Sequence, residues 1–171
     1  MKKLLSVMLL SLSLLACNTQ MDKTAQATKM AMMTEAEANA FVRPFYDHLS
    51  CQDNLAEVRQ LFAPEWRSYH SNDRWFGAEE ILTIVDAHLC ETVPDLKWQV
   101  KQVSVTANNE IVVRSKVEGT PEGQLFFDHP VGGESFHIMA IDIHTVKDGK
   151  IVKTYHVEDW YHAFDQIVNG G

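Results

Sequence analysis

Three polar side chains near the C-terminal end have the types that acid–base chemistry requires. Asp142 and His144 lie two residues apart in one run of alternating residues, and Asp159 follows the next run. A carboxylate among apolar side chains loses solvation, which raises its pKa toward the range in which a general acid or base works. A nearby imidazole can donate a hydrogen bond to charge that develops on a substrate. These residues predict a proton-transfer site if the fold turns them into an apolar pocket.

The two alternating runs predict a β-hairpin that positions these side chains. Asp148-Gly149 separates them, and this pair is typical of a two-residue turn that pairs Lys147 with Lys150. That register places Asp142 opposite Tyr155, and opposed residues share a face. The predicted inner face carries Phe136, Ile138, Ala140, Asp142, His144, Tyr155, Val157 and Asp159. A one-residue bulge would exchange the assignments, because the side-chain period of a strand is two. In the alternative interpretation, Asp142 is structural and Asp159 caps the last helix.

The other face of the first run is also apolar. Met139, Ile141 and Ile143 alternate with the inward set. A sheet face of this composition predicts an interface between copies of the chain. We therefore expect a homodimer or a homotetramer.

The rest of the chain predicts helices first and strands afterwards. Thr34 and Glu37 form a capping box for the first helix. A second helix is expected between Asp53 and Pro64, and a third between Gly77 and Pro94. Alternation then dominates up to a short final helix. This order predicts an α+β fold in which helices cover one face of a strongly curved antiparallel sheet and leave an internal pocket.

The N-terminal segment is typical of an export signal. Lys2 and Lys3 precede an uncharged apolar run that is too short to cross a bilayer. Its end, Leu14-Leu15-Ala16-Cys17, resembles the bacterial lipobox, in which the cysteine is lipidated; a plain secretory signal cleaved near Ala16 is the alternative. We expect a signal peptide at 1–16, lipidated Cys17 with a flexible tether at 17–33, and one domain at 34–171. The resemblance implies a lipid anchor in the bacterial cell envelope, and Asn18 favours the outer membrane facing the periplasm.

Two further cysteines, Cys51 and Cys90, allow a single pairing. Export to an oxidising compartment favours a disulfide. The alternative is two small buried hydrophobic side chains, and the sequence leaves both open.

Composition and motifs exclude several other functions. Hydrophobic residues make up 46%, which is enough for a folded core, and the formal charge of −8 leaves no basic surface for nucleic acid. The eight histidines are scattered, with no H-E-x-x-H motif, so that we expect no metal site. No G-x-S-x-G motif indicates a serine nucleophile. The membrane is expected to be contacted only through the lipid anchor.

The stretch Phe136 to Trp160, FHIMAIDIHTVKDGKIVKTYHVEDW, closely resembles the C-terminal signature of the SnoaL-like polyketide cyclases, also called ester cyclases. Val93-Pro94-Asp95-Leu96 and Gln124-Leu125-Phe126-Phe127 add to the similarity, which runs from about Phe41 to Ile167. The resemblance implies a cone-shaped α+β barrel shared with ketosteroid isomerase and scytalone dehydratase, usually assembled as dimers or tetramers.

The resemblance also implies a mechanism. In these cyclases an Asp four residues after an aromatic residue acts as general acid/base for an aldol closure, and Tyr155 to Asp159 has this spacing. No cofactor is implied. The expected substrate is a small hydrophobic molecule with a carbonyl group, which loses a proton from the adjacent carbon. Asp159 and His144 are the expected catalytic groups, and the expected substrate contacts are His70, Tyr155, Asp142, Trp66, Phe126 and Arg114.

Two alternatives share this fold. One is another enzyme, either an isomerase or an epoxide hydrolase in which Arg114 joins Asp142. The other is a non-catalytic lipoprotein that binds a hydrophobic metabolite.

Overall fold

The computed structural model describes residues 32–170. The predicted signal peptide and the lipidated Cys17 lie outside the described residues, so that the envelope location and the lipid anchor stay predictions. Within residues 32–170, no helix combines the length and the hydrophobicity needed to cross a membrane.

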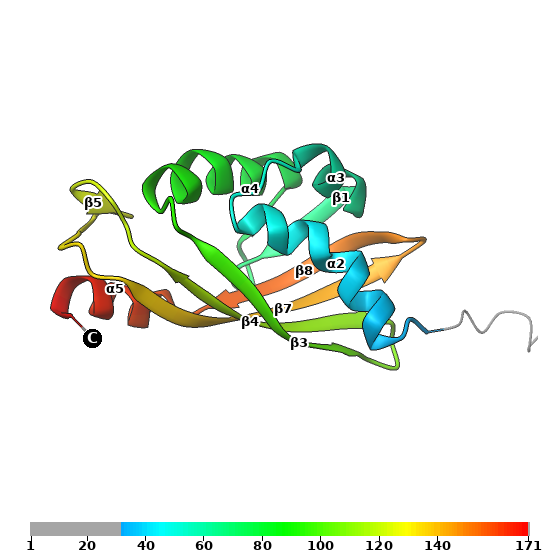
Figure 1. The fold of residues 1–171 in the computed structure, drawn as a ribbon. Coiled ribbons are helices and arrows are strands. Elements are labelled where there is room, and N and C mark those ends of the chain that lie inside the picture. Colours follow the sequence, from blue (N-terminus) through cyan, green and yellow to red (C-terminus); the bar gives the residue numbers. More distant parts are fainter. Residues whose placement is uncertain (1–31, 171) are drawn as a thin grey trace, which may run out of the picture. The chain divides into compact units, whose positions relative to one another are not determined.

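A layer of helices lies over one side of the sheet, as Figure 1 shows. The layer begins with the long helix α2 and continues through shorter segments. Their bounds are α2 Glu35–Leu49, α3 Leu55–Leu61, α4 Ala78–Ile84 and the π-helix η1 Val85–Cys90. A last helix, α5 (Trp160–Asn169), packs against β7 near the C-terminal end.

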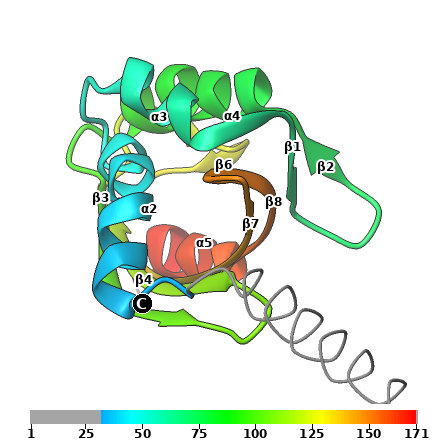
Figure 2. The ribbon, with the colours of Figure 1, turned by 90° about the vertical axis from the view of Figure 1, so that its right-hand side faces the viewer.

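The main sheet has six strands in the order β2-β1-β8-β7-β4-β3. Their bounds are β1 Phe62–Tyr69, β2 Trp75–Phe76, β3 Lys97–Val105, β4 Glu110–Gly119, β7 Phe136–Lys147 and β8 Lys150–Glu158. Neighbouring strands run antiparallel except β1 and β8, which are parallel. The sheet curves strongly (Figure 2) but does not close. The α+β prediction is confirmed, as an open cone. Strands β5 (Leu125–Phe126) and β6 (His129–Pro130) form a separate small sheet.

Helix α2 begins at the predicted capping box. The backbone N–H of Glu37 donates to Thr34 Oγ1 at 3.2 Å, and the Glu37 carboxylate accepts from the Thr34 N–H at 2.8 Å. Both bonds satisfy N–H groups that lack partners at a helix start. The helix buries the stripe Ala38, Val42, Phe45, Tyr46 and Leu49. It thereby packs Phe45 and Tyr46 against the inner face of the sheet.

The third predicted helix changes type along its length. It is α-helical from Ala78 to Ile84 and π-helical from Val85 to Cys90. A π-turn widens the helix by one residue per turn and is frequent at functional sites. Cys90 at its end forms a disulfide with Cys51, which follows α2. This settles the question that the sequence left open in favour of the bridge.

The predicted hairpin forms, but its register differs from the prediction. Lys147 pairs with Lys150 as expected, and a bulge between Thr145 and Val146 then shifts the remaining pairs by one residue. The prediction for β7 is confirmed, because Asp142 and its inward neighbours are buried. The prediction for β8 is wrong, because the bulge inverts its parity. The buried side chains of β8 are Ile151, Thr154 and His156, whereas Tyr155 and Val157 are exposed.

The outer face of the sheet carries exposed apolar side chains. Met139 is 51% exposed, Ile141 38% and Val157 68%. Met139 and Ile141 belong to the face that the sequence assigned to an interface between copies, whereas Val157 was predicted on the inner face and is turned outward by the bulge. The homo-oligomer stays a prediction.

Candidate active site

A cavity of about 670 Å³ lies between the helical layer and the sheet. This volume falls in the range of about 300–1,000 Å³ that suits a drug-sized ligand. Most of its wall is apolar and aromatic and comes from α2, η1, β3 and α5: Phe45, Leu49, Leu89, Trp98, Trp160 and Phe164. The cavity is therefore suited to a hydrophobic molecule.

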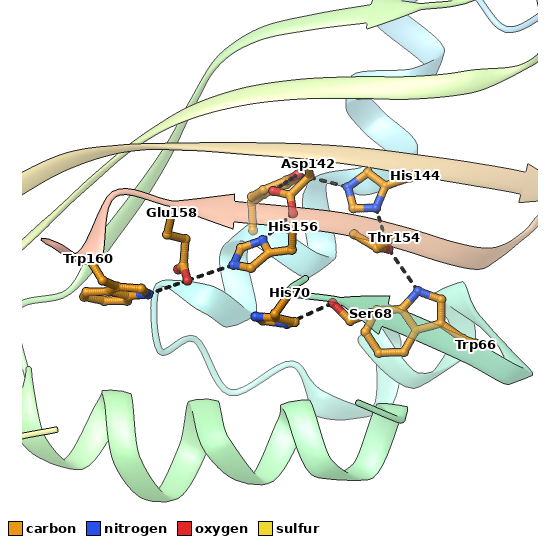
Figure 3. A network of polar contacts seen from close by, with 10 residues as sticks. Trp66, Ser68, His70, Asp142, His144, Thr154, His156, Glu158 and Trp160 are labelled. Carbon is orange, nitrogen blue, oxygen red and sulfur yellow. Dashed lines mark hydrogen bonds and ion pairs between the residues drawn. The ribbon is translucent and has the colours of Figure 1, made fainter. Parts of the chain in front are cut away.

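One part of the cavity wall is polar. It is formed by His70, which directly follows β1, and by His156 and Glu158 at the end of β8. The His156 Nε2 lies 2.9 Å from Glu158 Oε2, and the Trp160 indole N–H donates to the same oxygen at 2.5 Å (Figure 3). Both contacts fall on Oε2, and Oε1 has no protein hydrogen bond among the described residues. The rings of His70 and His156 lie 4.7 Å apart.

A buried chain of hydrogen bonds supports His156 from behind. Its Nδ1 lies 2.6 Å from Asp142 Oδ1, and the Tyr46 hydroxyl donates to Asp142 Oδ2 at 2.9 Å. The Tyr46 oxygen then accepts from His144 Nε2 at 3.0 Å. On the far side of that ring, the Thr154 hydroxyl donates to Nδ1 at 2.9 Å and accepts from the Trp66 indole at 3.0 Å. Every donor in this series of hydrogen bonds has an acceptor. The series therefore fixes one tautomer of His144 and one orientation of Asp142.

The surroundings of these groups shift their pKa values in opposite directions. Burial favours neutral His156, but Glu158 and then Asp142 outweigh it and raise the pKa of His156 well above its ordinary value. Burial also opposes the charge on Asp142, yet His156 holds the pKa of this carboxyl below its usual value. His156 is therefore a cation between two carboxylates. Desolvation followed by the charge of Asp142 raises the pKa of Tyr46, which stays a phenol.

His144 and His70, the two histidines next to His156, are neutral. Burial lowers the pKa of His144 to about 4, in agreement with the neutral tautomer that its hydrogen bonds require. Burial, followed by the charge of His156, lowers the pKa of His70 to about 4. His70 thus presents a neutral imidazole to the cavity beside a cationic one. This arrangement offers a ligand the carboxylate of Glu158 and the neutral imidazole of His70.

Among the predicted site residues, the structure brings one to the cavity wall and several close behind it. His70 lines the cavity. Asp142, His144 and Trp66 are buried in the supporting chain, where they hold His156 rather than meet a ligand. Phe126 is buried and packs edge to face on the exposed Phe127, which does line the cavity.

The remaining predicted site residues face away from the cavity. Tyr155 is 43% exposed and contacts Tyr69 and Lys153. Asp159 is exposed and caps α5, where its carboxylate accepts from the His162 N–H at 3.3 Å. Together with Arg114 it lines a second hollow of about 620 Å³. The expected inward orientation of Asp159 and Tyr155 is wrong, because the hairpin bulge turns them outward. The alternative interpretation of Asp159 as a helix cap is confirmed.

Sequence reasoning missed His156 and Glu158, which occupy the place expected of Asp159. One signal was present in the predicted register. An unbulged hairpin sets Lys153 opposite the buried His144, and a lysine is almost never fully buried without a partner. The bulge removes this cost, because it leaves Lys153 only partly buried and pairs His144 with Thr154.

Comparisons with known proteins identify the same fold in other proteins. The family model of the SnoaL-like domain matches residues 42–154, which is more than half of the chain. TsrD from Streptomyces laurentii is similar in structure, with a TM-score of 0.67 and 20% identity over 80% of this chain and 98% of TsrD.

A SnoaL-like polyketide cyclase from Agrobacterium tumefaciens gives a TM-score of 0.61 with 20% identity over 79% of this chain and 98% of that protein. No match to the sequence is found among curated proteins. At these identities the structures establish the fold alone. Together with the match of the family model, they show that the chain belongs to the SnoaL-like domain family.

Proposed function

We propose that the protein binds a small hydrophobic carbonyl compound in the cavity and catalyses proton transfer at the carbon next to the carbonyl. Glu158 is the general base in this proposal, in place of Asp159. The observation that carries it is the Glu158–His156 pair, which interrupts an otherwise aromatic wall. The fold, which it shares with a polyketide cyclase, supports the same class of reaction.

The roles follow from the contacts. Glu158 Oε1 carries no protein hydrogen bond among the described residues and can take a proton from the substrate carbon. His70, beside it, can hydrogen-bond the carbonyl oxygen, where negative charge develops in the enolate. Asp142 and Tyr46 keep the His156 ring in place, so that the pair is preorganised. The aromatic walls exclude water and orient the ligand.

The experiment is hydrogen–deuterium exchange on an aryl methyl ketone in D2O, followed by NMR with the full-length protein in a mild detergent. We expect the wild type to accelerate exchange of the methyl protons over buffer. Glu158→Gln keeps the size of the side chain but cannot take up a proton at neutral pH. It should lower the rate by roughly 10²–10⁴-fold, which is the usual contribution of a general base.

Glu134→Gln is the matched control, because Glu134 is exposed in the loop before β7. It should leave the exchange rate unchanged. Equal rates for Glu158→Gln and the wild type would overturn the role of Glu158. Binding of the ketone without any acceleration would instead favour the non-catalytic binding protein.

A further inference from the structure

Three residues of the polar wall have the composition of a metal site. His70, His156 and Glu158 each offer one ligand atom, and these atoms lie within 4.8 Å of one another. Two imidazoles and one carboxylate are a common ligand set for Zn²⁺ and for non-haem Fe²⁺. His70 directly follows β1, and His156 and Glu158 belong to β8, which is adjacent to β1 in the sheet but far from it in sequence. This is why the histidines look scattered in the chain.

The separations suit a single ion. An ion bound at about 2.0–2.2 Å from each atom draws tetrahedral ligand atoms to roughly 3.4 Å of one another. His156 Nε2 and Glu158 Oε2 lie 2.9 Å apart, with the Nε2 proton of the His156 cation between them, and an ion bound by both atoms would displace this proton into solvent. His70 lies in a bend just after β1, where a side-chain rotation can make the remaining adjustment.

The surroundings hold these ligands in the required orientation. Asp142, which is fully buried, contacts His156 Nδ1 at 2.6 Å and so directs Nε2 toward the cavity. A carboxylate on the second nitrogen of a ligating histidine is the usual outer partner in metal sites. The Trp160 N–H fixes Glu158 in the same way at 2.5 Å. Ser68 Oγ, 3.2 Å from His70 Nε2, fixes the third ligand.

We propose that His70, His156 and Glu158 bind one divalent transition metal ion, Zn²⁺ or Fe²⁺, with an open coordination position toward the cavity. The negative charges of Asp142 and Glu158 favour the cation. Arg74 on the cavity wall opposes it, but its guanidinium lies over the ring of Phe76 at 4.8 Å. The proposal differs from the expectation of no metal site that was drawn from the sequence alone. It rests on the proposed function only in using the same cavity, where the ion, held in part by His70, would polarise the carbonyl group in place of the hydrogen bond from His70.

The test is metal binding by the full-length protein in detergent after treatment with a chelator. Titration with Zn²⁺ in a calorimeter should show one ion per chain, and Co²⁺ should give a visible absorption band of a low-symmetry site. His70→Ala and Glu158→Gln should each weaken binding by more than about 100-fold, since losing even an outer partner of a ligand costs about 10–100-fold. His70 and Glu158 are near the cavity surface, and circular dichroism checks that both variants fold.

His162→Ala is the matched control, because His162 is exposed on α5 and lines the second hollow instead of the cavity that holds the three ligands. It should bind Zn²⁺ like the wild type. Failure of the wild type to bind, or equal affinity of the His70 and Glu158 variants, overturns the metal site.

The two proposals fail separately. Ketone exchange that persists unchanged in excess chelator, with no Zn²⁺ bound on titration, overturns the metal site and leaves the proposed function standing. Zn²⁺ binding that depends on His70 and Glu158, without ketone exchange or ketone binding, supports the metal site and overturns the proposed function.

Discussion

Replacement of Asp142 by asparagine is expected to destabilise the fold by about 3–5 kcal/mol, the usual cost of removing one partner of a buried ion pair. Asp142 is fully buried and receives the Tyr46 hydroxyl at 2.9 Å and His156 Nδ1 at 2.6 Å. Asparagine has one acceptor oxygen in place of two and no charge. One donor is left facing an amide group, and the His156 cation loses a carboxylate. Ketone exchange in the cavity should fall as well, because the His156 ring is no longer held.

Denaturant unfolding of the wild type and the variant measures this effect. Asp73→Asn is the matched control, because Asp73 is exposed in the loop between β1 and β2, and it should change the free energy of unfolding by less than about 0.5 kcal/mol. The pKa of Asp142 is lowered in the folded protein, so that its contribution is present above the ordinary value of 3.8 and is lost as the pH falls through the folded pKa. The difference between wild type and Asp142→Asn should therefore shrink in acid. A loss below 1 kcal/mol at neutral pH would contradict the buried network.

Removal of the disulfide has the second large effect. The double variant Cys51→Ser/Cys90→Ser should lose about 4 kcal/mol of stability, because the bridge closes a loop with a sequence separation of 39 residues. The bridge joins the end of α2 to the end of η1, next to Leu49 and Leu89 of the cavity wall. Ligand binding should weaken with the same substitutions, since the two walls are no longer tied together.

Unfolding with and without a reductant measures this contribution. Wild type in reductant and the double variant should unfold at the same denaturant concentration. The double variant itself should not respond to the reductant. A wild type that is equally stable in both conditions would show that the bridge does not constrain the chain.

The sequence was sufficient for the elements whose signals are local. The capping box at Thr34 and the Asp148-Gly149 turn both depend on residues within a few positions of one another, and both appear in the structure. The inward face of β7 was also predictable, because Ile138 and Ala140 alternate with Met139 and Ile141 on an exposed face.

The site itself depends on two features that local signals do not report. The bulge at Thr145–Val146 shifts the pairing of β8 by one residue and so exchanges its two faces. His156 and Glu158 therefore replace Tyr155 and Asp159 on the inner face. The parallel pairing of β1 with β8 brings His70 next to His156 and Glu158, which lie more than 80 residues away in the sequence. The prediction for Tyr155 and Val157 followed from the Asp148-Gly149 turn continued without a bulge, and no local signal in the sequence indicates the bulge.

The most direct test of the central claim is a crystal structure of the protein with a bromoaryl methyl ketone. The central claim is that a hydrophobic carbonyl compound lies in the cavity with its carbonyl oxygen at His70 and the carbon next to the carbonyl group at Glu158. The account predicts anomalous bromine density between Trp98 and the helical wall, with the ketone oxygen within hydrogen-bond distance of His70. Bromine density in the hollow beside Asp159 and Arg114, with the main cavity filled by protein side chains, would contradict it.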